Sequence, residues 1–365
     1  MKTGFWKKQW VRILSFFLIL LLLLAGMSSV TMRAAADQSS RPYLKRDAVE
    51  MEVRKEAADS LDVLVLGDSE AYRSFSPLQL WNERGITSFT IGLSGAKMTE
   101  LLHLLDVAAE TQKPRVVLLE TDALYRIQGS AAGMQEIFLE RWSSWFPVFQ
   151  YHNLWKQVFD GAQPVTAGQW KGFHMAAGVK AADAGSYMAE SREKRPVSSC
   201  NRLLLGKIKD KCATMGADLV LYSAPSTVNY NSSRHNAIAE LAQQMGIAYL
   251  DLNQEAEAIG INWQTDTSDA GDHLNVSGAQ RVTQRLGGFL QQYSIADKRK
   301  NAAYASWNSL GAQYRDKADR VIQKIRNKAD AGSSPDKTDG SVSKPDKADR
   351  SGEKSSENIR ERGRR

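Results

Sequence analysis

Residues 63–72 read VLVLGDSEAY. Four apolar residues run directly into Gly67, Asp68 and Ser69. A short apolar run that ends on a glycine is typical of a buried strand in a parallel sheet. A serine at the tip of such a strand belongs either to a simple connecting loop or to a nucleophilic site. The rest of the chain has to distinguish these two interpretations.

Short β-rich runs alternate with helical stretches through most of the chain. We expect strands at residues 62–67, 87–95, 115–120, 217–225 and 247–253, and helices at 76–85, 97–112 and 234–246. Near-continuous apolar strands that alternate with helices predict a parallel sheet covered on both faces. Right-handed crossovers then give a three-layer α/β/α sandwich with a flavodoxin-like sheet. In such sheets reactive groups gather beyond the carboxyl ends of the strands, where Ser69 is expected.

The N-terminus carries a targeting signal. A basic stretch, residues 1–12, precedes an apolar run at 11–30 that has no charge after Arg12. About 20 residues of helix cross a bilayer core of roughly 30 Å. The basic residues before the run predict a cytoplasmic N-terminus and a body outside the cytoplasm. We favour an uncleaved single-pass anchor in the cell membrane. Cleavage at Ala34-Ala35-Ala36, which would release a secreted protein, is the alternative.

Composition divides the chain into segments. We expect the anchor at 1–36, a polar stalk at 37–60, the main domain at 61–300 and a disordered charged tail at 315–365, because the apolar period ends near Ile325. The alternation of strands and helices lapses at 125–198. This insertion is rich in Trp and Phe, which indicates either a cap that faces a partner or an extra helical subdomain with its own core.

Charge and cysteine content exclude some functions. The net charge is +7, and residues 315–365 alone hold 15 Lys and Arg against 10 Asp and Glu. The middle of the chain is therefore near neutral and lacks the basic face of a nucleic-acid binder. The two cysteines, Cys200 and Cys212, lie on one predicted helix, roughly 18 Å apart. We expect two free thiols, because bridged Cα atoms must lie within about 7 Å.

Ser69 can act as a nucleophile only with a base and a group that holds the base. The candidate base is His273, in TSDAGDHLNVSGAQRV at 267–282, where Asp269 and Asp272 flank it. An acyl-transfer site also needs N–H donors for the developing oxyanion. The Ser69 backbone and Gly95, which follows the second strand, are the candidates. No cofactor or metal is expected, because the other histidines lack ligand-like neighbours.

These blocks, in this order, resemble the SGNH (GDSL-type) hydrolase superfamily. LVLGDSEAYRSFSP, VVLLETDALYR, YSAPSTVNYN and DAGDHLNVSGA are most similar to the membrane-anchored SGNH-like proteins that accompany membrane-bound O-acyltransferases. The resemblance spans about residues 62–290. It implies an SGNH fold, a nucleophile at Ser69, a base at His273 and an oxyanion contact at Gly95. It also implies a membrane-bound O-acyltransferase as partner and a bacterial surface polysaccharide as acceptor.

Two positions depart from the family pattern. The family's triad Asp lies three residues before the His, where this chain has Ala270. Asp269 could take the role if the loop is one residue longer, and Asp272 ranks second. The family's third block supplies an Asn to the oxyanion hole, where this chain has Thr121 or Asp122; a charged Asp122 would repel an oxyanion. From the DHLN block, Asn275 joins Gly95 and Asp122 as a candidate oxyanion or substrate contact.

Several alternatives stay open. Ser94, in GLSGA, could be the nucleophile of a hydrolase elbow, although no partner favours it. Arg73 and residues 229–236 could line a glycan groove, but turns and helix caps are the favoured interpretation. The predicted function is an O-acyltransferase, most simply an O-acetyltransferase, that acts on a polysaccharide outside the cytoplasm. The rivals are an esterase with the same triad and a catalytically weak glycan-binding scaffold.

Overall fold

A computed structural model describes residues 3–37, 44–127, 129–151 and 168–332 of the chain. Its centre is a five-stranded parallel sheet with the strand order β2-β1-β3-β4-β5. The strands are β1 (Val63–Gly67), β2 (Ser88–Gly92), β3 (Val116–Glu120), β4 (Asp218–Ser223) and β5 (Ala248–Asp251). All four neighbouring pairs are parallel, as the alternating pattern predicts.

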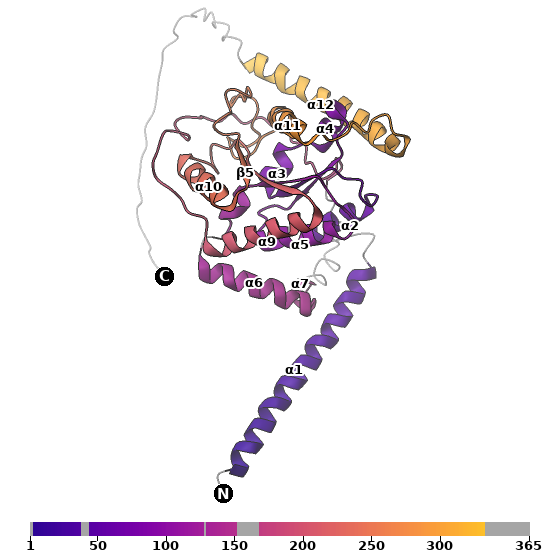
Figure 1. Cartoon of the computed structure of the whole chain (residues 1–365), viewed down its shortest axis with the longest axis vertical. Helices are drawn as coiled ribbons and strands as arrows, with labels where there is room; N and C mark the ends of the chain where they lie inside the picture. Colours follow the sequence, from indigo (N-terminus) through magenta and orange to yellow (C-terminus); the bar gives the residue numbers. More distant parts are fainter. Residues whose placement is uncertain (1–2, 38–43, 128, 152–167, 333–365) are drawn as a thin grey trace, which may run out of the picture.

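Helices cover both faces of this sheet, which confirms the three-layer sandwich (Figure 1). Successive strand residues point to opposite faces. Leu64, Leu66 and their neighbours pack against α5 (Met98–Ala109), α9 (Ser199–Met215) and α10 (Ser232–Met245). Val63 and Val65 face the other layer, made of α3 (Ser69–Ser74), α4 (Pro77–Arg84) and α11 (Val276–Leu290).

Local sequence explains where these helices begin and end. Ser76 caps α4 by accepting the Gln79 N–H, and Pro77 follows at the first helical position, where its missing N–H costs nothing. Gly85 ends α4 with φ 68°, a left-handed conformation that glycine adopts without a steric penalty. Both Cys200 and Cys212 lie buried on α9 as free thiols, as predicted.

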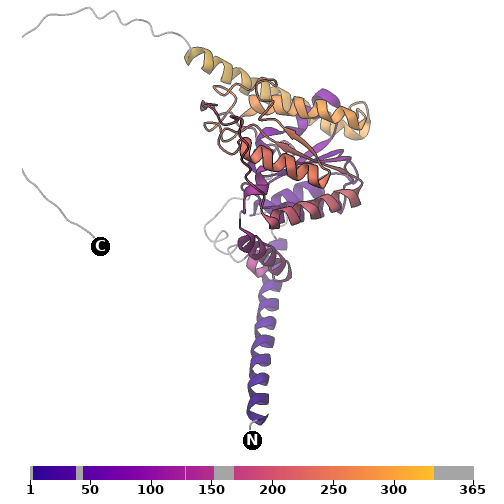
Figure 2. The same ribbon diagram turned by 60° about the vertical axis from the view of Figure 1, so that its left-hand side comes forward.

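The N-terminal helix α1 (Thr3–Asp37) projects away from the sandwich (Figure 2). Its segment Lys8–Arg33 is long and apolar enough to cross a membrane, and a signal sequence near an N-terminus has the same properties. The predicted stalk at 37–60 is wrong in part, because α2 (Lys45–Lys55) packs on the domain through Ala48, Val49 and Val53. Residues 38–43 of this predicted stalk lie outside the described part of the chain.

The predicted tail also begins too early. Helix α12 (Ala305–Gly332) crosses α4 and α11, so residues 315–332 are helical. The reason is an apolar face that continues through Ala318, Val321, Ile322 and Ile325, all of which are buried. Residues 333–365 of the predicted tail lie outside the described residues.

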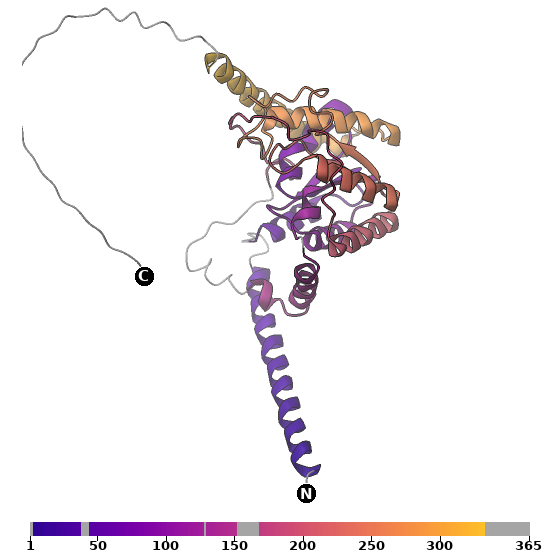
Figure 3. The ribbon, with the colours of Figure 1, turned by 90° about the vertical axis from the view of Figure 1, so that its left-hand side faces the viewer.

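The short helix η1 (Asp122–Tyr125) leads into the predicted insertion at 125–198, which contains α6 (Ser130–Trp145) and α7 (Val148–Tyr151). These two helices lie below the sandwich, beside the C-terminal end of α1 (Figure 3). Residues 152–167 of the insertion lie outside the described part. Residues 168–197 then return along the domain, and this segment passes beside the candidate site. The short elements η2 (Gln291–Tyr293) and η3 (Ala302–Tyr304) connect α11 to α12.

Candidate active site

The site lies at the carboxyl edge of the sheet, where β1 and β2 end side by side at the paired residues Gly67 and Gly92. The end of β1 requires a glycine at position 67. A Cβ there would lie 2.6 Å from the Ala71 Cβ and 2.8 Å from the Glu120 Cβ. Only glycine allows α3 to begin so close to the strand. The helix was not predicted, and Ser69 is its first residue, with 7% of its surface exposed.

His273 is held by Asp269. The carboxylate of Asp269 accepts the His273 backbone N–H at 2.6 Å through Oδ1 and lies 2.7 Å from the His273 Nδ1 through Oδ2. The second candidate, Asp272, has its Oδ2 3.5 Å from the same nitrogen. The structure therefore brings Asp269 rather than Asp272 into hydrogen-bonding contact with the imidazole.

The loop conformation makes this contact possible. Ala270 and Gly271 both have positive φ, 63° and 91°, so the chain curls back and places Asp269 against His273 although four residues separate them. A Cβ on Gly271 would lie 1.9 Å from the Thr227 Oγ1, so this turn also requires glycine. The left-handed conformation of Ala270 and Gly271 thus accommodates the one extra residue that separates Asp269 from His273 relative to the family pattern.

Glu70 joins the loop to the start of α3. The carboxylate of this residue, the neighbour of Ser69, lies within 4.8 Å of a His273 ring nitrogen and of the Asp272 carboxylate. Asn229 donates from Nδ2 to Glu70 at 2.7 Å and to Asp272 at 2.5 Å. His273 is therefore placed beside the first turn of α3. Within the described residues no hydrogen bond joins His273 to the Ser69 hydroxyl; such contacts often tighten only when substrate binds.

Buried acids dominate the electrostatics of this edge. Burial and neighbouring carboxylates raise the pKa of Glu70 and of Glu120 well above the usual range. The pKa of Asp68 is raised to about 7, mainly by burial and then by the charge of Asp122, although the opposite charge of Arg126, whose Nε–H donates to Asp68 at 2.6 Å, lowers it. Burial and the neighbouring acids therefore favour the protonated form of the Glu70 carboxyl.

The three candidate oxyanion and substrate residues occupy different environments. Gly95 lies in the turn after β2 with φ 65° and open space around it, which lets another group approach its backbone. The Asp122 carboxylate is bound by Arg126 at 2.6 Å and by Arg234 at 2.5 Å. Asn275 is fully buried, and its side chain caps α11 by accepting the Ser277 N–H. Asp122 and Asn275 are therefore engaged within the protein, and Gly95 remains accessible.

A cavity of about 640 Å³ lies one helical turn from Ser69. Arg73, four residues after Ser69 and therefore on the same face of α3, lines it together with Trp170 and His174. His174 packs on Tyr72 with ring centroids 4.4 Å apart. The same segment then reaches the His273 loop, because the Val276 N–H donates to the Ala176 carbonyl. The segment that lines the cavity therefore also contacts the first residue of α11, three residues after His273.

Sequence reasoning missed the roles of Glu70, Asn229 and Arg126. Arg126 binds the buried Asp68 and Asp122, which holds the end of β1 against the end of β3. Glu70 lies in the opening motif itself. A charged residue so soon after a buried strand was the sequence signal that could have identified it as a site residue. In the 229–236 segment the predicted capping role fits Asn231, which caps α10 by accepting the Arg234 N–H.

A metal ion would find one possible set of ligands at this edge. Glu70, Asp272 and His273 hold ligand atoms that lie within 4.8 Å of one another. Asn229 donates to both the Glu70 and the Asp272 carboxylates and so already bridges them.

Comparison with known proteins gives distant likenesses only. No protein-family model and no curated protein sequence matches the chain. A GDSL-like lipase from Bacteroides thetaiotaomicron is similar over 68% of this chain and 97% of its own, with 10% identity and a TM-score of 0.35. The protein TesA is similar over 63% and 98%, with 14% identity and a TM-score of 0.33.

An acetyl xylan esterase from the rumen bacterium Butyrivibrio proteoclasticus is similar over 65% of this chain and 64% of its own. Its identity is 9% and its TM-score 0.29. At these identities and TM-scores the three likenesses support no conclusion about activity.

Proposed function

We propose that the chain is a serine-nucleophile O-acyltransferase of the SGNH type that acts on a polysaccharide outside the cytoplasm. The observation that carries this proposal is the contact of Asp269 with His273, in a loop that reaches the first turn of α3 where Ser69 begins. A carboxylate on Nδ1 leaves Nε2 of the imidazole as the proton acceptor, which is the arrangement that a serine nucleophile needs.

The proposed reaction has two halves. His273 Nε2 takes the proton of the Ser69 hydroxyl as the oxygen attacks the acyl carbonyl of a donor. The leaving group departs with that proton, and an ester forms on Ser69. His273 then takes a proton from a sugar hydroxyl, whose oxygen attacks the ester. The Ser69 oxygen leaves, regains the proton, and the acyl group is on the sugar. Backbone N–H groups near Ser69 and Gly95 would stabilise both oxyanions.

The acceptor sugar is assigned to the cavity beside Arg73. It lies one turn of α3 from Ser69 and combines an aromatic ring, Trp170, with cationic side chains from Arg73, Lys317 and Lys324. Aromatic faces and donor groups of this kind suit a polyhydroxylated polymer. Acyl groups activated inside the cell would have to cross the membrane, so a membrane-bound O-acyltransferase is the proposed donor partner.

An esterase would use the same three residues with water as the acceptor. The experiment that separates the two incubates the full chain in detergent with p-nitrophenyl acetate and an oligosaccharide acceptor, followed by mass spectrometry. We use the full chain because α12 packs on the domain. Acetylated sugar that disappears in Ser69→Ala and His273→Ala supports transfer. Free acetate without acetylated sugar, across several acceptors, supports the esterase, and no turnover contradicts both.

A further inference from the structure

Helices α6 and α7 expose large apolar side chains on one face. Phe138 is 61% exposed and Trp145 64% exposed, and Met134, Leu139 and Phe149 are exposed as well. Together with Trp142, whose ring contacts Phe138, Trp145 and Phe149, we call these six residues the α6–α7 aromatic surface. Outside α1, the other exposed large apolar residues in the described chain are Leu203 and Val228. Such a concentration marks an interaction surface.

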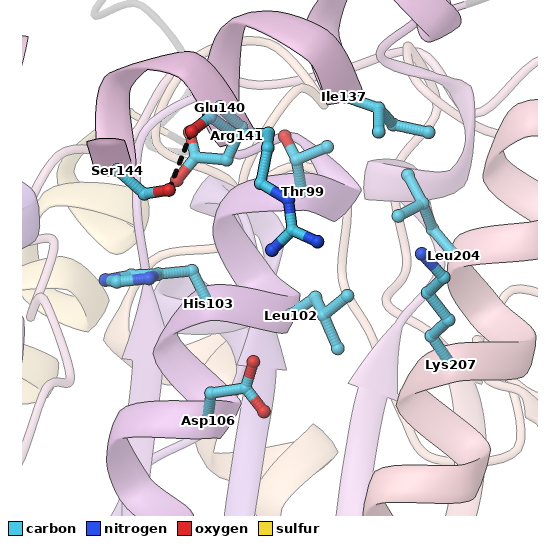
Figure 4. A pocket seen from close by; sticks show the side chains of 10 residues that line it. All are labelled: Thr99, Leu102, His103, Asp106, Ile137, Glu140, Arg141, Ser144, Leu204 and Lys207. Carbon is cyan, nitrogen blue, oxygen red and sulfur yellow. Dashed lines mark hydrogen bonds between the residues drawn. The ribbon is translucent and has the colours of Figure 1, made fainter. Parts of the chain in front are cut away.

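The opposite face of α6 is fixed to the domain. Glu136 pairs with Lys97 at 2.8 Å, and Glu140 pairs with Arg46 at 2.8 Å. Beneath the helix, a cavity of about 360 Å³ separates α6 from α5 and α9, and Ile137 faces it (Figure 4). Both carboxylates of α6 are therefore occupied on the domain side. The aromatic surface faces outward and carries no carboxylate of its own.

The contact between α7 and α1 fixes the position of the aromatic surface along the axis of α1. The Val148 N–H donates to the Ser28 Oγ at 3.5 Å, and Ser28 is buried against α7. Ser28 lies inside the apolar segment Lys8–Arg33, five residues before its end. Five helical residues rise roughly 7.5 Å. If α1 crosses a bilayer, α7 therefore lies level with the outer boundary of the hydrocarbon (Figures 1 and 3).

We propose that the α6–α7 aromatic surface lies in the interfacial layer of the membrane and holds the domain against the lipid. Trp and Phe are the side chains that this layer favours, and a helix in the membrane plane buries its apolar face about 5–10 Å deep. The Arg141 guanidinium lies 5.9 Å from the Trp145 ring centroid and lines the cavity on the domain side of α6, so it borders the surface without being part of it (Figure 4). The surface continues the one that α1 offers to lipid, which favours a bilayer over a protein partner.

The test places a fluorophore on the surface in the full chain. Phe138→Cys is labelled with an environment-sensitive dye, which spares Cys200 and Cys212 because both are buried. Val228→Cys is the matched control, since Val228 is equally exposed, at 61%, in the loop that follows β4. Both proteins are placed in nanodiscs of equal parts phosphatidylethanolamine and phosphatidylglycerol. Spin-labelled lipid should quench most of the emission at position 138 and little at position 228.

Iodide in the water should show the reverse order, quenching position 228 severalfold more than position 138. Equal iodide quenching at the two positions, without quenching by spin-labelled lipid at 138, would overturn the proposal and leave a protein as the occupant. A second pair of labelled proteins, Trp145→Cys and Leu203→Cys, repeats the comparison if Phe138→Cys does not fold. Failure here says nothing about Ser69, because acyl transfer is measured separately.

Discussion

Two regions of this molecule depart from the usual rule that charged side chains are exposed and apolar ones buried, and they do so in opposite ways. The carboxyl edge of the sheet buries acids, with Asp68, Glu70 and Glu120 almost wholly inside. The α6–α7 aromatic surface exposes rings that a soluble domain would bury. Each arrangement costs stability, because buried charge must be neutralised and exposed apolar area must stay hydrated. We therefore read the first as a site for chemistry and the second as a site for contact.

The largest effect expected is on turnover at the buried edge. Ser69→Ala should lower the hydrolysis of p-nitrophenyl acetate by at least about 10³-fold, because the nucleophile is lost while the fold is kept. Phe138→Ala, on the exposed surface, should leave the rate of the detergent-solubilised chain unchanged. Ser94→Ala is the control for the rival nucleophile. Equal rates in Ser69→Ala and the parent protein would show that the carboxyl edge of the sheet is not the active site.

The two acids beside His273 should differ next. Asp269→Asn should lower the same rate by about 10²-fold or more, since a carboxylate on Nδ1 orients the imidazole and stabilises its protonated form. Asp272→Asn should cost tenfold or less, because its oxygen lies 3.5 Å from Nδ1. Steady-state kinetics with matched circular dichroism would decide. The reverse order would assign the triad to Asp272.

Stability should separate a buried apolar face from an exposed one. Ile322→Ala on α12 should lower the free energy of unfolding by about 2–4 kcal/mol, the usual cost of emptying a packed site. Phe138→Ala on α6 should change it by less than about 0.5 kcal/mol. Urea unfolding of the full chain in detergent measures both. If Ile322→Ala left the free energy of unfolding unchanged, residues 315–332 would be only loosely packed on the domain.

The smallest expected effect is a change of pH dependence. Burial raises the pKa of Glu70, so the native state binds this proton more tightly than the unfolded chain does. The resulting stability is fully present below the unfolded pKa and is lost as pH rises through the folded value. Glu70→Gln carries no such proton. Relative to the parent, the stability of Glu70→Gln should therefore increase as the pH rises from about 5 to about 9.

Unfolding curves at the two pH values provide the measurement. Glu136→Gln, on the domain face of α6, is the matched control, because no comparable burial applies to it. A difference between Glu70→Gln and the parent that is independent of pH would mean that the Glu70 carboxyl is ionised in the native protein.

The fold was largely predictable from sequence because apolar runs and glycine stops are local signals. Every predicted strand appears, Gly85 and Gly246 cap α4 and α10 as predicted, and α5 ends at Ala109, three residues before the predicted end. The segment beyond Tyr314 was misjudged because its apolar positions are separated by charged ones. Only the packing of α12 on the domain shows that Ile322 and Ile325 belong to one buried face.

The candidate site was predictable in part. Ser69 and His273 stand in recognisable blocks, whereas the choice between Asp269 and Asp272 depends on backbone geometry. Nothing in the residue type of Ala270 announces a φ of 63°. The bridge from Asn229 to Glu70 joins residues 159 positions apart, so no local pattern could reveal it. The sequence alone could not show which residues lie close together in the fold, and this proximity decides whether Asp269 or Asp272 contacts His273.

The most direct test of the central claim is covalent trapping of the nucleophile in the full chain. A fluorophosphonate probe reacts only with a serine that a neighbouring base has activated. The peptide that contains residues 63–72 should carry the adduct on Ser69, and His273→Ala should abolish the labelling. Labelling at Ser94 instead, or no labelling of the folded protein, would contradict the proposed site.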